Sequence, residues 1–107
     1  MTSHTEWLMS RDLEAPPELM ACVRDLIASR PEWERLGRVD AFIAASESLL
    51  RRVLVGGAMA RENALDLLAA DACVTWAFEA AADDPRTLAA FAERSTKGIA
   101  LIAAEFA

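Results

Sequence analysis

Apolar side chains recur every three to four residues through most of this 107-residue chain, the spacing that places them on one face of an α-helix. The pattern predicts four helices, over residues 17–29, 29–55, 59–82 and from 85 nearly to the C-terminus. Only four glycines and four prolines are present, fewer than a turn-rich β architecture needs. We therefore expect an all-α fold, an antiparallel bundle of about four helices.

Local signals place the helix boundaries. Pro17 suits the first turn of a helix, where its missing N–H costs nothing. Ser29 followed by Glu32 has the spacing of a capping box, which predicts that the second helix begins there. That helix either continues to Val55 or breaks at Gly37.

The N-terminal 15 residues form an arm that the double proline at 16–17 separates from the bundle domain, residues 16–107. The arm is either disordered or docked as a short turn. Its apolar side chains, the candidates for docking, are Trp7, Leu8, Met9 and Leu13.

Charge and hydropathy limit the kinds of partner that the chain is expected to bind. The net charge is −6 with only eleven basic residues, and no basic cluster interrupts the acidic balance, so neither nucleic acid nor an anionic membrane is expected to bind. No stretch reaches the ~18 apolar residues of a membrane span, and the N-terminus lacks the pattern of a signal peptide, which predicts a cytoplasmic protein. Ten arginines against one lysine, with 23 alanines, indicate a GC-rich bacterial gene.

Most catalytic chemistry lacks the residues it needs. His4 is the only histidine and falls in the arm, expected to be a mobile tail, so a Ser-His-Asp triad, an ordinary zinc site and a di-iron motif are all excluded. No glycine-rich phosphate loop is present. Cys22 and Cys73 lie among apolar neighbours and are expected to be buried thiols, a disulfide being the alternative. We expect a non-enzymatic protein without metal or cofactor.

Three polar residues interrupt the apolar faces of the predicted helices. Ser46 and Ser95 each lie at the centre of an apolar face, and Asp71 lies between Leu67 and Val74. If the helices pack as antiparallel neighbours, Ser46, Asp71 and Ser95 could share one buried polar layer or line a pocket. The alternative is structural: a helical serine bonds the carbonyl one turn back, and Asp71 lies at the edge of its face with Thr75 and Glu79.

The helix predicted over residues 59–82 is apolar on two faces, whereas an ordinary bundle helix needs one. One row reads Ala60, Ala64, Leu67, Asp71, Val74 and Phe78. The other reads Leu65, Leu68, Ala72 and Trp76, and we expect it to be the seam of a homodimer. The alternative is that the N-terminal arm covers this second row.

Two classes of function remain after these exclusions. The first is a small helical interaction or regulatory module, self-associating, with a protein partner that the sequence does not identify. The second is a small-molecule-binding bundle with its pocket near the Ser/Asp layer.

Overall fold

The computed structural model describes residues 2–11, 15–56, 61–82 and 85–106, apart from the side chains of residues 61–62, 85–88, 90–91 and 95. The described part is 89% helical and contains no strand, which confirms the all-α class. In chain order the elements are α1 (His4–Arg11), α2 (Pro17–Ala28), the 3-10 helix η1 (Pro31–Arg35), α3 (Arg38–Gly56), α4 (Arg61–Ala81) and α5 (Pro85–Glu105).

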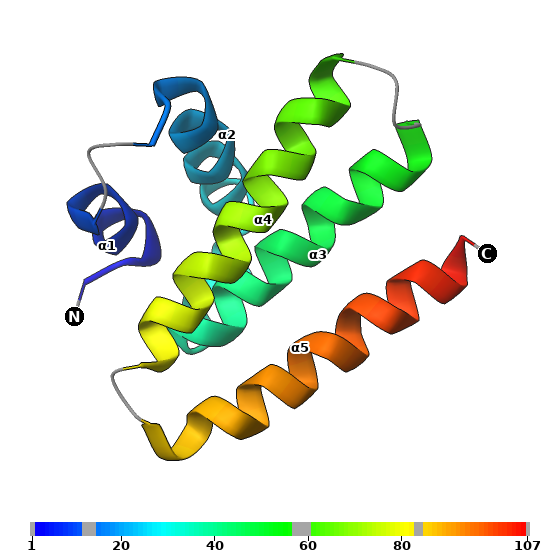
Figure 1. Cartoon of the computed structure of the whole chain (residues 1–107). Helices are drawn as coiled ribbons and strands as arrows, with labels where there is room; N and C mark the ends of the chain where they lie inside the picture. The colour runs from blue at the N-terminus through cyan, green and yellow to red at the C-terminus, as the bar shows by residue number, and fades with distance from the viewer. Residues whose placement is uncertain (1, 12–14, 57–60, 83–84, 107) are drawn as a thin grey trace.

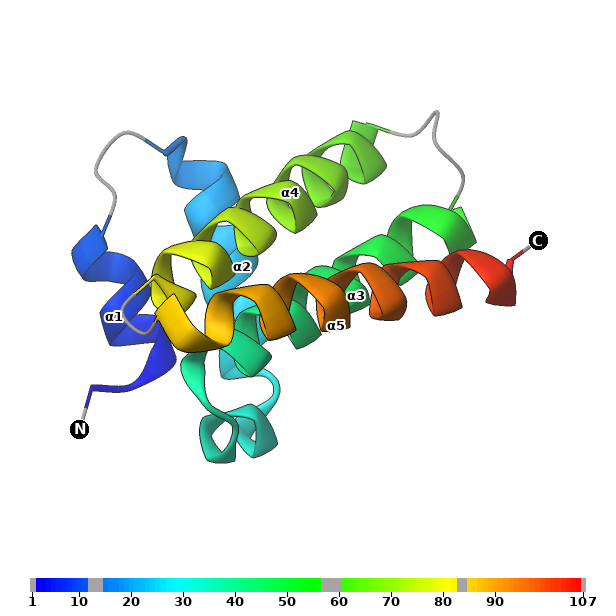
Figure 2. The same ribbon diagram turned by 60° about the horizontal axis from the view of Figure 1, so that its bottom comes forward.

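The packing is dominated by α3 and α4, which lie side by side and run in opposite directions (Figure 1). Helix α5 runs along this pair, and α2 crosses it at a steep angle (Figures 1 and 2). Helix α1 lies at the end of the molecule where α4 finishes. Three helices therefore run together, with α2 and α1 on one side of them.

Small side chains explain why α3 and α4 approach so closely. Where the two helices meet, each contributes side chains that are fully buried and no larger than cysteine: Ala41, Ala45, Ala69, Cys73 and Ala77. Helices approach most closely where side chains at the contact are small, because the interaxial distance depends on their size. Beside this contact Phe42 is fully buried, and its ring meets those of Trp7 (centroids 5.2 Å apart) and Trp76 (6.2 Å).

The N-terminal arm docks on the rest of the chain as helix α1. Leu8 is fully buried in the core cluster, and Arg11 pairs with Glu79 of α4 at 3.1 Å. The Trp7 ring contacts Phe42 at a tilted angle, and the guanidinium groups of Arg11 and Arg38 lie over it, 5.0 and 5.3 Å from its centroid. Of the predicted docking residues, Met9 is half exposed and Leu13 lies outside the described residues.

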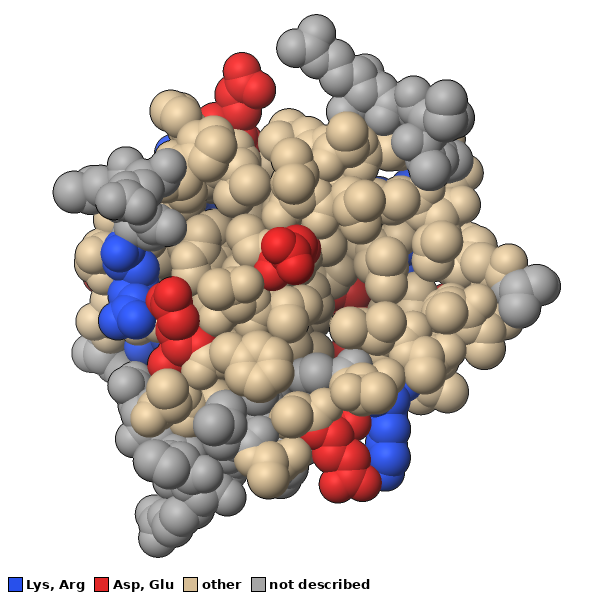
Figure 3. All heavy atoms as spheres, in the orientation of Figure 1, with Lys and Arg blue, Asp and Glu red and all other residues tan. Residues whose placement is uncertain are grey.

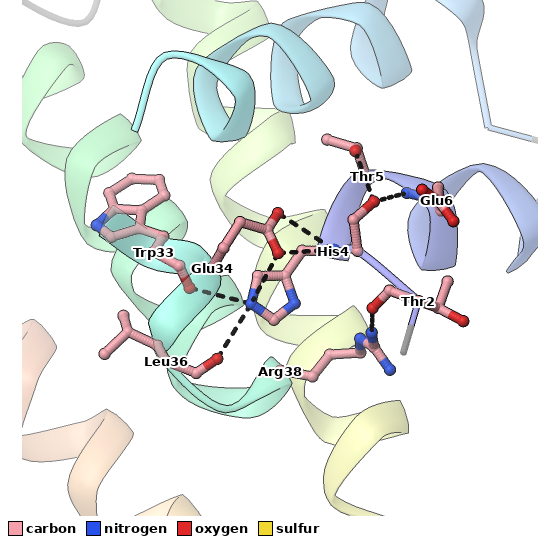
Figure 4. Close-up of polar contacts among 9 residues, drawn as sticks. Thr2, His4, Thr5, Glu6, Trp33, Glu34, Leu36 and Arg38 are labelled. Atoms are coloured by element: carbon pink, nitrogen blue, oxygen red, sulfur yellow. Dashed lines mark hydrogen bonds and ion pairs between the residues drawn. The ribbon is translucent and has the colours of Figure 1, made fainter. Parts of the chain in front are cut away.

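The expectation that His4 lies in a mobile tail is wrong. Its ring is buried, and Nε2 lies 3.0 Å from the carbonyl oxygen of Trp33 and 3.1 Å from that of Leu36 (Figure 4). Because carbonyl oxygens only accept, Nε2 carries the hydrogen and shares it between them. The main-chain N–H of His4 also faces the Glu34 carboxylate at 3.4 Å. The histidine thus fastens α1 to η1.

The predicted capping box is also wrong. Ser29 ends α2, and its hydroxyl donates to the carbonyl of Leu26 at 2.6 Å. The residues that follow form η1, whose start has no side-chain cap. Of the two alternatives for this region, the break at Gly37 is the one observed, since α3 begins at Arg38.

Candidate functional site

An apolar groove of about 460 Å³ lies among α3, α4 and α5. Its walls come from all three helices: Ser46, Leu50, Leu67, Leu68, Ala70, Asp71, Val74 and Ile99. Its position follows from helix periodicity, because Leu67, Asp71, Val74 and Phe78 recur at intervals of four and three residues and therefore share one side of α4. That side faces away from α1 and α2, which cover the other.

Ser46 and Asp71, two of the three residues of the predicted polar layer, line this groove together. Ser46 is 4% exposed, and its hydroxyl donates to the carbonyl of Ile43, three residues back, at 2.8 Å. This bond occupies its only hydrogen, so the oxygen presents only lone pairs to the groove. The side chain of Ser95 lies outside the described residues, and its place in the layer stays a prediction.

Asp71 is exposed at the mouth of the groove. The hydroxyl of Thr75 donates to the main-chain carbonyl of Asp71 at 3.3 Å. The Asp71 carboxylate itself has no hydrogen bond or ion pair within the described part of the chain. Thr75 and Glu79 are exposed as well, as expected if Asp71 lies at the edge of an apolar face. The groove therefore has at its mouth a carboxylate that no described side chain pairs with.

The predicted self-association seam does not form one exposed surface, and this prediction is wrong. Trp76 is only 4% exposed because it packs edge-on against Phe42, and Leu65 and Ala72 pack against the same core. Only Leu68 is open, at 60%. The alternative given for this row, that the arm covers it, stays a prediction: Trp7 of α1 contacts Phe42 of α3, and it is Phe42 that contacts Trp76.

The apolar surface that α4 exposes is the other row. Leu67 and Phe78 are exposed, as are Ile99 and Leu101 of α5 and Phe106, which follows α5. Figure 3 shows that uncharged side chains cover most of this face and that charged groups are few in its middle. Large exposed apolar patches on a folded chain mark sites of interaction. We call the groove and its exposed rim, Leu67, Leu68, Phe78 and Ile99, the α4–α5 face.

Both cysteines are free thiols. Cys73 is fully buried at the contact between α3 and α4, and burial, with a smaller effect from Cys22, raises its pKa to about 12. The half-buried Cys22 lies 3.7 Å from the Asp66 carboxylate; burial and this negative charge raise its pKa as well. A thiol becomes a good nucleophile when its pKa falls, so neither environment activates the sulfur.

His4 does not look like a catalytic base. Nε2 is occupied by two carbonyls, and Nδ1 is buried and has no hydrogen-bond partner among the described residues. Among the described residues no group of three His, Cys, Asp or Glu side chains could hold a metal ion.

A second cavity, about 810 Å³, lies between the end of α2 and α3 and contains three arginines. Each guanidinium already has a carboxylate partner. The pairs are Arg30–Glu32 (3.7 Å), Arg51–Glu105 (3.2 Å) and Arg52–Asp66 (3.7 Å). Since these charges are matched, the cavity offers an anion little net attraction, and the groove is the stronger candidate site.

Comparisons with family models, with curated proteins and with solved structures find no match to this chain. None of the described helices is both long enough and apolar enough to cross a membrane.

Proposed function

We propose that this protein is a non-enzymatic helical interaction module that self-associates as a homodimer through the α4–α5 face. The observation that carries the proposal is the apolar groove, whose rim residues Leu67 and Leu68 are more than half exposed in the single chain. A helix of the second copy lying in this groove would pack against α3, α4 and α5. It would make a bundle of four helices, three from one chain and one from its copy.

The accessible surface of the chain supports the proposal. It measures 6730 Å², whereas a folded monomer of this mass exposes about 5,800 Å². The excess is roughly 900 Å², close to the ~800 Å² that each partner buries in an interface of standard size. A dimer would therefore bring the exposed area back to the usual value.

Sedimentation of the full chain at micromolar concentration tests the proposal. We expect a dimer, and we expect Leu67→Glu to give a monomer, because the change places a charge at an apolar interface. Val55→Glu is the matched control: Val55 is 75% exposed at the end of α3 and lines the arginine cavity instead of the groove. A wild-type monomer, or a dimer that both variants leave intact, would refute self-association through this face.

A second function, binding of a small molecule, is favoured by one observation: the groove brings Ser46 and Asp71 together at its apolar wall. Its volume lies within the ~300–1,000 Å³ range of ligand sites, which combine apolar walls with a few polar groups. A bound ligand raises the melting temperature by mass action, so a ligand screen read by thermal melting tests this function. The screen counts against it if every stabilising compound acts equally on a Leu67→Glu variant.

A further inference from the structure

The polar groups of the groove show what kind of molecule it suits. We infer that its ligand is a small apolar cation, an alkylammonium-like group on a hydrocarbon body. This inference rests on the second function proposed above, ligand binding in the groove.

The first argument is hydrogen-bonding capacity. The two polar residues of the groove, Ser46 and Asp71, offer acceptors only, because the Ser46 hydrogen is donated to Ile43 and an ionised carboxylate has none. A ligand carboxylate or carbonyl would find no donor among these side chains, and an acceptor left buried without a partner costs free energy. An ammonium group brings three donors.

The second argument is charge. The Asp71 carboxylate has no ion-pair partner in the described part of the chain. The two cationic side chains of α5 that the structure describes are engaged elsewhere: Arg94 with Asp40 at 3.1 Å and Lys97 with Glu93 at 3.2 Å. The whole chain carries −6. A cation is therefore attracted to the mouth of the groove, and a fatty-acid anion is repelled from it.

The third argument is the groove wall. Apart from Ser46 and Asp71 the wall is made of leucine, valine, isoleucine and alanine side chains. It therefore suits a hydrocarbon body and offers it no further polar contact. Burying one methylene contributes ~0.8 kcal/mol, so each added methylene should tighten binding by about fourfold until the groove is full.

The experiment compares three probes of equal chain length by calorimetry on the full chain: octylammonium, octanol and octanoate. We expect octylammonium to bind most tightly, hexylammonium to bind about tenfold or more weaker than octylammonium, and octanoate to bind least. Asp71→Asn should weaken octylammonium binding by about two- to fivefold, the effect of an exposed ion pair, and leave octanol binding unchanged.

Glu93→Gln is the matched control, since it removes the same charge from an exposed residue outside the groove. An equal loss in both variants would mean that only the overall charge attracts the probe, and it would overturn the inference. Octanol or octanoate binding as tightly as octylammonium would also overturn it while leaving the groove a ligand site. If no probe binds, both this inference and the ligand-binding function fail; a dimer in sedimentation would then assign the groove to a second copy.

Discussion

At the scale of single residues, Ser46 and His4 show two ways in which a polar side chain can be buried. Ser46 bonds a carbonyl of its own helix, three residues back. His4 bonds carbonyls about thirty residues away, those of Trp33 and Leu36. The first contact needs only helix geometry, whereas the second needs the tertiary fold.

Cys73 gives a prediction about pH at this scale. Its pKa is raised from 9.0 to about 12 by burial, so the unfolded chain releases the thiol proton at lower pH than the folded chain. The stability that this difference provides is complete below pH 9 and is lost as the pH rises from 9 toward 12. At pH 10 the loss amounts to about 1.4 kcal/mol, the energy of one pKa unit.

Urea unfolding at pH 8 and pH 10 measures this loss, with Cys73→Ala as the comparison. The variant is expected to be less stable at both pH values, because it leaves a cavity, but to lose less stability between them. Equal losses in the two proteins would contradict the raised pKa.

The contrast between the local bond of Ser46 and the long-range bonds of His4 explains which site residues could be predicted from sequence. Ser46 was predicted to be buried because it lies at the centre of an apolar face, and the structure agrees. Asp71 was correctly assigned to the same row of α4 as Leu67 and Val74. Periodicity alone does not say whether a partner helix covers that row. His4 could not be predicted, because a main-chain carbonyl carries no signal in the sequence.

At the scale of elements, the main difference between prediction and structure is which face of α4 is covered. Both rows of α4 are apolar, so composition could not decide between them. The choice depends on α1 and α2, whose packing on the Trp76 side follows from long-range contacts such as Trp7 with Phe42. The helices from α2 onward were predicted well, because their periodicity is local; the region after Ser29 and the N-terminal arm, which forms helix α1, were misassigned.

The docking of α1 leads to a second prediction. Leu8 is fully buried and its neighbour Met9 is half exposed, so the two form a matched pair on one helix. We expect Leu8→Ala to lower the free energy of unfolding by about 2–5 kcal/mol. Met9→Ala should change it by less than about 0.5 kcal/mol. Chemical denaturation followed by tryptophan fluorescence measures both, and similar values would mean that α1 does not dock.

At the scale of the whole molecule, the large accessible surface links stability to assembly. A dimer that binds only folded chains becomes more stable as the protein concentration rises. We therefore expect the melting temperature of the wild type to increase when the protein concentration is raised from about 1 to about 100 µM. The melting temperature of Leu67→Glu should stay constant over the same range. A wild-type melting temperature independent of concentration would argue against the dimer.

The attachment of α5 has a consequence for how the molecule opens. Among its described side chains only Ile102 is fully buried, and its two ion pairs to α3, Arg94–Asp40 and Arg51–Glu105, are exposed and therefore weak. Such a helix can separate from the rest at a free energy below that of global unfolding, as a cooperative unit of its own.

Native-state hydrogen exchange would show this hierarchy directly. The amides of α5 should exchange together and earlier than those of α3 and α4, and Ile102→Ala should speed their exchange while leaving the α3–α4 amides nearly unchanged. Leu101→Ala, at a neighbouring residue that is 68% exposed, should have little effect on either group. The wall of the groove that carries Ile99 would then be present for only part of the time, so that whatever fills the groove also lengthens the life of the closed helix.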